Sequence, residues 1–285
     1  MDDYHLDGQP ESETKKVRGL AIAILVVLVA AAVISYFVFI KKPAAPAAPQ
    51  TPPAESVAPA GEVKAAGVPG EPLAFPAVAL GESDLAVRDF AAALSSNPEF
   101  AKWLLTKDLI RKFVVAVDNV ANGLSPKPHV DFFTPAGPFR VARTKKGTLL
   151  DEASYSRYDS VTGVVLSLDA AAAVRLYRAV RPLLQEAYRD LGYPGVDFED
   201  TLVRAMAELL GTPVVEGPVR LEQKILSFAM TDEALESLSA AQKQLLRMGP
   251  KGVRAFHGKI RELAAALGVL ESRLPPTKIY TPRAE

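Results

Sequence analysis

Residues 169–192 read DAAAAVRLYRAVRPLLQEAYRDLG, and apolar side chains recur along this stretch every three to four residues. Such spacing places them on one face of a helix with 3.6 residues per turn. Asp169 is a typical N-cap and Gly192 a typical stop, so the pattern predicts a long helix between them. Pro182 predicts either a kink or two helices that meet there. The apolar positions are Ala173, Leu176, Tyr177, Val180, Leu183, Leu184, Ala187, Tyr188 and Leu191.

Similar helical patterns occur on both sides of this stretch. Ser83 or Asp84 is a suitable cap for a first helix, and Asn97-Pro98 suits the start of a second. A single helix is expected from Thr231 or Asp232 to Met248. Further helices are predicted over residues 84–96, 98–104, 108–122, from about 154, over 197–211 and over 251–267.

Extended segments are expected in two places. Prolines 126, 128, 135 and 138 exclude a long helix between residues 124 and 150. Phe139–Arg143 and Thr148–Leu150 are candidate strands of a small hairpin. A short extended segment is also possible within Gly217–Ala229. Residues 77–285 are therefore predicted to form a single, mainly α, helical-bundle-like domain with a small β-hairpin.

Residues 19–40 read GLAIAILVVLVAAAVISYFVFI, an apolar run of 22 residues without a charge. As a helix the run spans roughly 33 Å, enough to cross a hydrocarbon core of about 30 Å. The alternative, a cleaved signal peptide, has an apolar region of only about 7–15 residues. The sequence therefore predicts one retained transmembrane helix and, through residues 19–40, the lipid bilayer as a partner.

Residues 41–76 are predicted to be a flexible, disordered linker, because nine of the 34 residues from Pro43 to Pro76 are proline and few are large and apolar. Stretched out, these residues reach on the order of 100 Å. Residues 1–18 carry three Lys/Arg near the apolar run, against two directly after it. This small difference, with a linker suited to crossing an envelope compartment, favours a cytoplasmic tail (1–18) and a periplasmic domain (77–285) at the inner membrane.

Composition excludes several kinds of chemistry. The chain has no cysteine, which rules out disulfides, thiolate nucleophiles and cysteine-bound metals. Its three histidines are scattered, and no phosphate-binding, dinucleotide-binding or hydrolase motif is present. Lys+Arg and Asp+Glu are 33 each, so nucleic acid is not an expected partner. No catalytic residue, cofactor or metal site is predicted.

Two clusters are candidate binding sites. Arg157, Tyr158 and Asp159 follow Tyr155 in an aromatic-rich stretch, which indicates either a polar core network or the wall of a ligand pocket. Lys243 and Arg247 lie one helical turn apart, next to Gln242. From Lys243 onward there are nine Lys/Arg against three Glu, so this region is either a solvated basic face or a patch for an anionic partner.

Polar groups on two apolar helix faces need partners. Gln242 falls on the seam of the helix expected over residues 232–248, where an unpaired amide costs about 1–3 kcal/mol. Asp118 borders the apolar face of the helix over 108–122. We expect Asp118 to form a structural ion pair with Arg157 or Arg247.

Four motifs resemble a bacterial family catalogued as domain of unknown function 3014. They are FVVAVDN (113–119), YSRYD (155–159), PLLQEAYRDLG (182–192) and AAQKQLLRMGP (240–250), behind an N-terminal anchor and a Pro/Ala linker. The resemblance covers about residues 80–267. It implies a protein anchored in the bacterial inner membrane, and it supplies no activity or catalytic residue.

The sequence favours a binding or scaffolding module of the cell envelope, with an envelope protein, lipid headgroups or the cell wall as partner. The alternatives are an envelope enzyme with an unrecognised Asp/Tyr/Arg/Lys site and a purely structural spacer. A deep pocket lined by Arg157, Tyr158, Asp159 and Arg247, with a perturbed carboxylate, would favour the enzyme. A flat basic or apolar surface would favour the interaction module.

Overall fold

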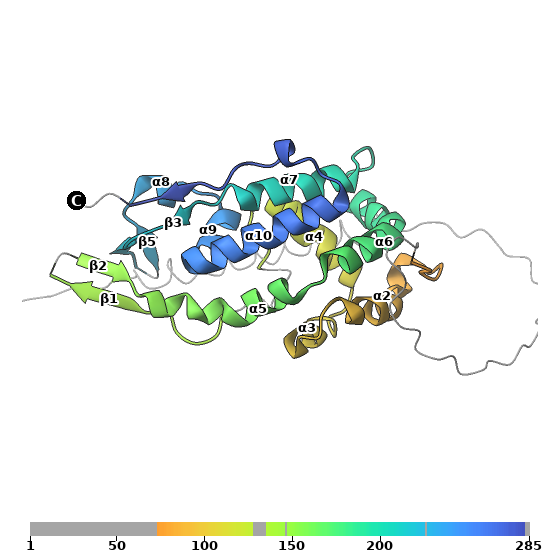
Figure 1. Ribbon diagram of the computed structural model, residues 1–285, viewed down its shortest axis with the longest axis horizontal. Coiled ribbons are helices and arrows are strands. Elements are labelled where there is room, and N and C mark those ends of the chain that lie inside the picture. The colour runs from red at the N-terminus through yellow and green to blue at the C-terminus, as the bar shows by residue number, and fades with distance from the viewer. Residues whose placement is uncertain (1–72, 128–134, 146, 226, 283–285) are drawn as a thin grey trace, which may run out of the picture. The chain divides into compact units, whose positions relative to one another are not determined.

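The computed structural model describes residues 73–127, 135–145, 147–225 and 227–282 (Figure 1). The predicted cytoplasmic tail, transmembrane helix and linker up to residue 72 lie outside these ranges. Within them, no single helix has the length and apolar composition needed to cross a membrane. Only Glu152–Ser167 and Ala170–Asp190, two segments bent by 76° at their junction, meet those criteria together.

The described part of the chain is mainly helical, as predicted. Helix α6 runs unbroken from Ala170 to Asp190 with Pro182 inside it, so the two-helix alternative was wrong. Asp169 caps α6 by accepting a 2.6 Å hydrogen bond from Ala172 N. The other α-helices in the described ranges are α2 (Asp84–Ala91), α3 (Pro98–Trp103), α4 (Leu109–Ala121), α5 (Asp159–Ser167), α7 (Phe198–Leu210), α8 (Glu233–Glu236), α9 (Ala240–Leu246) and α10 (Gly249–Leu267). The 3₁₀ turns are η1 (Leu80–Glu82), η2 (Ala92–Leu94), η4 (Glu152–Ser154), η5 (Ser156–Tyr158) and η6 (Glu271–Arg273).

The main core lies where α4, α6 and α7 pack together, with α10 alongside them (Figure 1). At its centre Tyr188 is fully buried, and its hydroxyl lies 2.9 Å from that of Thr201. Leu73 and Phe75, inside the predicted linker range, also pack against this core, and the Phe75 ring lies 5.3 Å from that of Phe90.

A four-stranded antiparallel sheet contains the predicted hairpin. Strands β1 (Val141–Thr144) and β2 (Gly147–Leu150) form that hairpin, and β2 also pairs with β4 (Arg220–Gln223), which pairs with β5 (Phe228–Met230). The extended piece expected within 217–229 is therefore a second hairpin. Strands β3 (Val214–Val215) and β6 (Ile279–Tyr280) form a separate parallel pair.

Alternation along the strands gives the larger sheet one apolar face. Because paired residues share a face, the pairs Val141–Leu150 and Leu221–Met230 lie on the same side of the sheet. This face packs against Leu235 of α8 and Leu246 of α9. It forms a second core, built from two segments about 70 residues apart in the sequence.

The single helix predicted over residues 232–248 is two helices, α8 and α9. The break arises at Ser239, whose hydroxyl accepts a hydrogen bond from Gln242 N (3.1 Å), while Gln242 Oε1 accepts one from Ser239 N (3.3 Å). This reciprocal capping box begins a new helix. Gln242 is therefore a capping residue rather than a polar residue on a continuous apolar seam.

Ser83 is the N-cap residue of α2, one of the two predicted positions, but the helix has no side-chain cap. Neither Ser83 nor Asp84 caps α2 through its side chain, and the Ser83 hydroxyl donates to Leu80 O instead (2.8 Å). The Asp84 carboxylate accepts hydrogen bonds from the backbone N–H groups of Asp108 (2.7 Å) and Leu109 (2.8 Å). It thereby holds the start of α4, where Asp108 has a left-handed φ of 57°.

A candidate binding pocket between the sheet and helix α9

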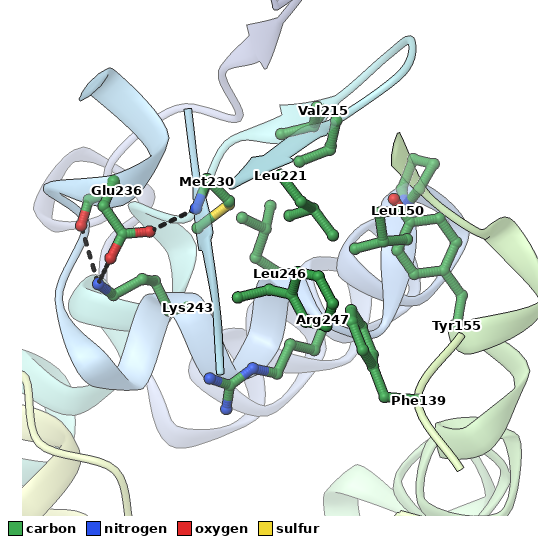
Figure 2. A pocket seen from close by; sticks show the side chains of 14 residues that line it. Phe139, Leu150, Tyr155, Val215, Leu221, Met230, Glu236, Lys243, Leu246 and Arg247 are labelled. Atoms are coloured by element: carbon green, nitrogen blue, oxygen red, sulfur yellow. Dashed lines mark hydrogen bonds and ion pairs between the residues drawn. The ribbon is translucent and has the colours of Figure 1, made fainter. Parts of the chain in front are cut away.

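A cavity of about 130 Å³ lies between the apolar face of the four-stranded sheet and α9 (Figure 2). Its interior is apolar, and charged side chains stand at one edge. Figure 2 shows Glu236 and Lys243 on one side and Phe139 and Tyr155 on the other, with Leu246 and Arg247 between them. The lining residues are Phe139, Leu150, Tyr155, Val215, Val219, Leu221, Phe228, Met230, Glu236, Lys243, Leu246, Arg247, Gly249 and Pro250.

Tyr155 closes one wall of the pocket against the start of α10. Gly249 there has φ +71°, and a Cβ on it would lie 2.5 Å from Cγ of the Tyr155 ring. Only glycine tolerates both that backbone conformation and that close approach. Burial, and after it the charge of Glu152, raise the pKa of the Tyr155 hydroxyl.

Glu236 neutralises Lys243 at the edge of the pocket. Lys243 Nζ donates to the backbone oxygen of Glu236 (2.8 Å) and to its Oε1 (3.0 Å), while Oε2 accepts from Met230 N (2.9 Å). Burial works to raise the pKa of Glu236, but these hydrogen bonds and the charges of Lys243 and Arg247 outweigh it and lower that pKa. Glu236 is thus ionised, with both carboxylate oxygens occupied.

Arg247 differs from its neighbour Lys243. It is exposed, and its Nη1 donates to the neutral Oε1 of Gln244 (2.7 Å). No acidic side chain in the described part of the chain forms an ion pair with it. The pocket therefore joins an apolar interior to an arginine whose charge is not paired.

Arg157 contributes to the pocket indirectly. Its Nε donates to Gly137 O (3.1 Å), and its guanidinium lies 5.8 Å from the centre of the Phe139 ring. Since Phe139 lines the pocket, Arg157 supports that wall without being part of it. The structure thus brings Lys243 and Arg247 to one pocket and places Arg157 behind it.

The remaining candidates lie elsewhere. Tyr158 is 4% exposed and belongs to a core cluster with Val253 and Phe256. Asp159 is exposed in the first turn of α5, where a carboxylate is favoured by the helix dipole. The Gln242 side chain completes its capping box and donates to Glu208 O (3.2 Å).

The expected ion pair of Asp118 with Arg157 or Arg247 was wrong. Asp118 Oδ1 accepts a hydrogen bond from Asn122 (3.2 Å), one turn further along α4. Its charge, and after it burial, raise the pKa of the Tyr193 hydroxyl. Tyr193 stacks on Tyr188 at 4.6 Å, so Asp118 faces the end of α6 rather than the sheet.

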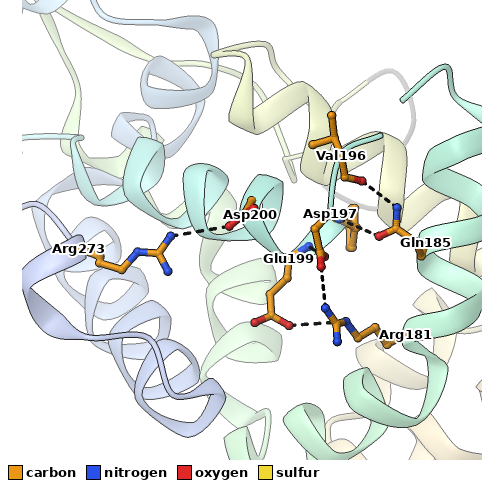
Figure 3. Close-up of polar contacts among 8 residues, drawn as sticks. Arg181, Gln185, Val196, Asp197, Glu199, Asp200 and Arg273 are labelled. Atoms are coloured by element: carbon orange, nitrogen blue, oxygen red, sulfur yellow. Dashed lines mark hydrogen bonds and ion pairs between the residues drawn. The ribbon is translucent and has the colours of Figure 1, made fainter. Parts of the chain in front are cut away.

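A second hollow, between α6 and the loop before α7, is shallow, and its rim is already paired (Figure 3). Arg181 forms ion pairs with Asp197 (2.7 Å) and Glu199 (3.8 Å). Gln185 clamps the loop by donating to Val196 O (2.8 Å) and accepting from Phe198 N (3.0 Å). These contacts fasten α6 to α7, and they leave the pocket at the sheet as the better candidate.

Sequence reasoning missed most of the pocket wall. The β1–β2 hairpin was predicted, but Leu221 and Met230 lie on β4 and β5, and no local pattern reveals the pairing of β4 with β2. Glu236 falls inside the single helix that was expected to run to Met248. One signal was present: Gly249-Pro250 interrupts the helical pattern shortly after α9, and Gly249 adopts the positive φ that favours glycine.

The fold and pocket define a mainly helical domain with a small sheet and an apolar binding pocket. Residues 109–264 match the family described as protein of unknown function (DUF3014), and the chain belongs to that family. The resemblance seen in the sequence is thereby confirmed. No curated protein and no solved structure matches the chain.

Proposed function

We propose that the chain is a membrane-tethered binding module of the bacterial cell envelope, and that its pocket holds an apolar side chain of an envelope protein beside a carboxylate. The observation that carries this proposal is the charge arrangement at the rim. Glu236 neutralises Lys243, whereas Arg247 lacks an acidic partner within the described ranges. A ligand with an acidic group next to an apolar one would fill the cavity and complete the ion pair.

The size of the cavity fits one side chain. A dry cavity of about 150 Å³ lined by apolar residues binds benzene. The pocket, at about 130 Å³, is suited to a leucine-sized group rather than a whole cofactor. Interfaces of this kind draw much of their affinity from a single anchor residue in a desolvated pocket.

The pocket favours binding over the envelope-enzyme alternative. The perturbed carboxylate, Glu236, has a lowered pKa, and both its oxygens accept hydrogen bonds. A general base needs a pKa near the working pH and a free oxygen facing the substrate. Glu236 instead serves to position Lys243.

The proposed location rests on the sequence. Residues 19–40 anchor the chain in the inner membrane, residues 1–18 face the cytoplasm, and the domain from residue 77 faces the periplasm. The uncharged run of 22 residues and the proline-rich linker support this arrangement. Envelope proteins are then the partners within reach.

Photolabelling tests the pocket. The probe is N-acetyl-photo-leucine, a diazirine analogue of leucine that carries a free carboxylate, and the full chain is held in phosphatidylcholine nanodiscs. We expect labelling at Leu150, Leu221 or Leu246, mapped by mass spectrometry, and much weaker labelling by the neutral amide of the same probe. Arg247→Gln should lower labelling by the acid to the level of the amide, whereas Arg189→Gln, a change at an exposed arginine of α6, should not. Equal labelling by acid and amide in the unmodified chain would overturn the proposal.

A topology test addresses the location. Alkaline phosphatase fused after Glu285 should be active, and a fluorescent protein that fails to mature outside the cytoplasm should stay dark at the same position. The reverse pattern would place the domain in the cytoplasm and leave the pocket result to stand by itself.

A further inference from the structure

The two hairpins of the four-stranded sheet turn at the same end. The first turn is closed by the pairing of Thr144 of β1 with Gly147 of β2, and the pairing of Thr148 with Leu221 makes β4 run toward that turn. The turn between β4 and β5 closes at the same end, where Lys224 N donates to Ser227 O (2.9 Å). β1 and β4 both flank β2, so their ends lie about 10 Å apart.

An apolar side chain projects from the second turn. Ile225 is 99% exposed, more than any other large apolar side chain in the described ranges. Tight hairpin turns favour Gly, Asn and Asp, because these residues tolerate the backbone conformation and are compatible with water. A β-branched apolar residue here gains nothing from the fold and exposes its whole side chain.

Basic side chains flank this apolar tip. Arg143 and Lys145 are exposed, and neither forms an ion pair with another described residue. Lys224 is paired with Glu222 at 2.6 Å, and Glu222 lies on the opposite face of the sheet from Arg143, as the pairing register requires. The end of the sheet thus carries two unpaired positive charges beside an exposed apolar group.

We infer that this end of the sheet docks on an anionic lipid surface, with Ile225 entering the headgroup region and with Arg143 and Lys145 binding lipid phosphates. The combination of an apolar tip with basic flanks matches the chemistry of the bilayer interface. The inference rests on the membrane anchor of the proposed function and is independent of the pocket. The linker predicted from the sequence, with an expected reach on the order of 100 Å when stretched, would allow the domain to reach the bilayer to which it is tethered.

Docking would give the module a defined orientation on the membrane. The pocket opens on the same face of the sheet from which Arg143 projects, because Arg143, Thr148 and Leu221 are paired across the sheet. A docked sheet therefore holds the pocket close to the lipid surface. The segments of envelope proteins that it meets would be those next to the membrane.

The absence of cysteine allows a direct test. A single Ser227→Cys change, labelled with the environment-sensitive dye NBD, reports on the turn, and Glu186→Cys on α6 serves as the control position. The full chain is placed in nanodiscs of phosphatidylcholine with or without phosphatidylglycerol. We expect NBD at position 227 to become brighter and blue-shifted with phosphatidylglycerol, and to be quenched by nitroxide-labelled lipid, while NBD at position 186 is not.

Variants separate docking from mere proximity. Arg143→Gln and Lys145→Gln should each lower the ratio of docked to undocked chain by about fivefold. Ile225→Glu should abolish quenching at position 227, and Arg189→Gln should leave it unchanged. All four sites are exposed, so unchanged thermal unfolding confirms an intact fold.

Two results would overturn the inference: equal quenching at positions 227 and 186, or a signal at 227 that does not depend on phosphatidylglycerol. Extraction by alkaline carbonate distinguishes this failure from failure of the anchor. A chain that carbonate removes from vesicles lacks the proposed transmembrane helix, whereas a retained chain without quenching at 227 has its anchor but no docking surface.

Discussion

The helices of the core and the sheet of this domain form in different ways, because each helix follows a local pattern in the sequence, whereas the sheet pairs segments about 70 residues apart. In the core, Tyr188 bonds Thr201, only 13 residues further along the chain. In the sheet, Leu149 is paired with Arg220, and the pocket lies between segments this far apart. The largest buried cluster lies among the helices, and the candidate site lies at the sheet. We therefore expect substitutions in the core to affect folding and those at the pocket to affect binding.

The largest effect is expected in the core. Leu184 is 1% exposed on α6, so Leu184→Ala should lower the free energy of unfolding by about 2–5 kcal/mol. Leu150→Ala, at a half-buried position in the pocket, should lower the free energy of unfolding by only about 1 kcal/mol, because Leu150 already borders an empty space. Denaturant unfolding of the full chain in detergent, followed by the fluorescence of the single tryptophan, Trp103, measures both. Equal losses would remove the distinction between the two regions.

The next effect is expected at the junction of the two regions. Gly249→Ala should destabilise by about 3 kcal/mol, because it adds backbone strain and displaces the Tyr155 ring. Gly268→Ala is the matched control: its φ is +93° but no atom lies within 4 Å of the added Cβ, so only strain of about 1 kcal/mol is expected. Similar costs at both glycines would show that Tyr155 does not pack as described.

A smaller effect is expected at the start of α4. Asp84→Ala removes the acceptor of two backbone hydrogen bonds and should cost about 1 kcal/mol. Asp89→Ala, at an exposed position of α2, the helix that also carries Asp84, should lower the free energy of unfolding much less. The same unfolding assay compares the two, and a neutral Asp84→Ala would contradict the capping role.

The smallest effect concerns pH. His257 is 3% exposed, and burial lowers the pKa of its imidazole below 6.5, although the contact with Leu209 O opposes this. The unfolded chain therefore binds a proton more readily than the folded one, and stability should fall as the pH drops below about 6.5. His257→Gln should flatten that part of the pH profile. An unchanged slope would assign the acid sensitivity to other groups.

The sequence predicted the individual helices of the core well. The period of α6, its cap at Asp169 and the range of α7 were visible because a helix is specified by residues three and four apart. The break at Ser239 was missed because the serines before α9 are a weaker signal than the apolar spacing on both sides of them. Asp84 was assigned to its own helix because its true partners, Asp108 and Leu109, are about 25 residues away.

The site was predicted only in part for the same reason. Lys243 and Arg247 stood out in the sequence as a basic pair. Only Lys243 forms an ion pair with Glu236, which lies across the break between α8 and α9, and the sequence did not reveal this difference. The apolar wall depends on the register of β2 against β4. Neither feature has a local signature.

The central claim is that Arg247 holds the acidic group of a ligand whose apolar part fills the pocket. The most direct measurement is calorimetric titration of the full chain in nanodiscs with N-acetyl-leucine and with its neutral amide. We predict that the acid binds more tightly than the amide, and that Arg247→Gln removes this difference while leaving unfolding unchanged. Equal affinities for acid and amide, or a difference that survives Arg247→Gln, would contradict the account.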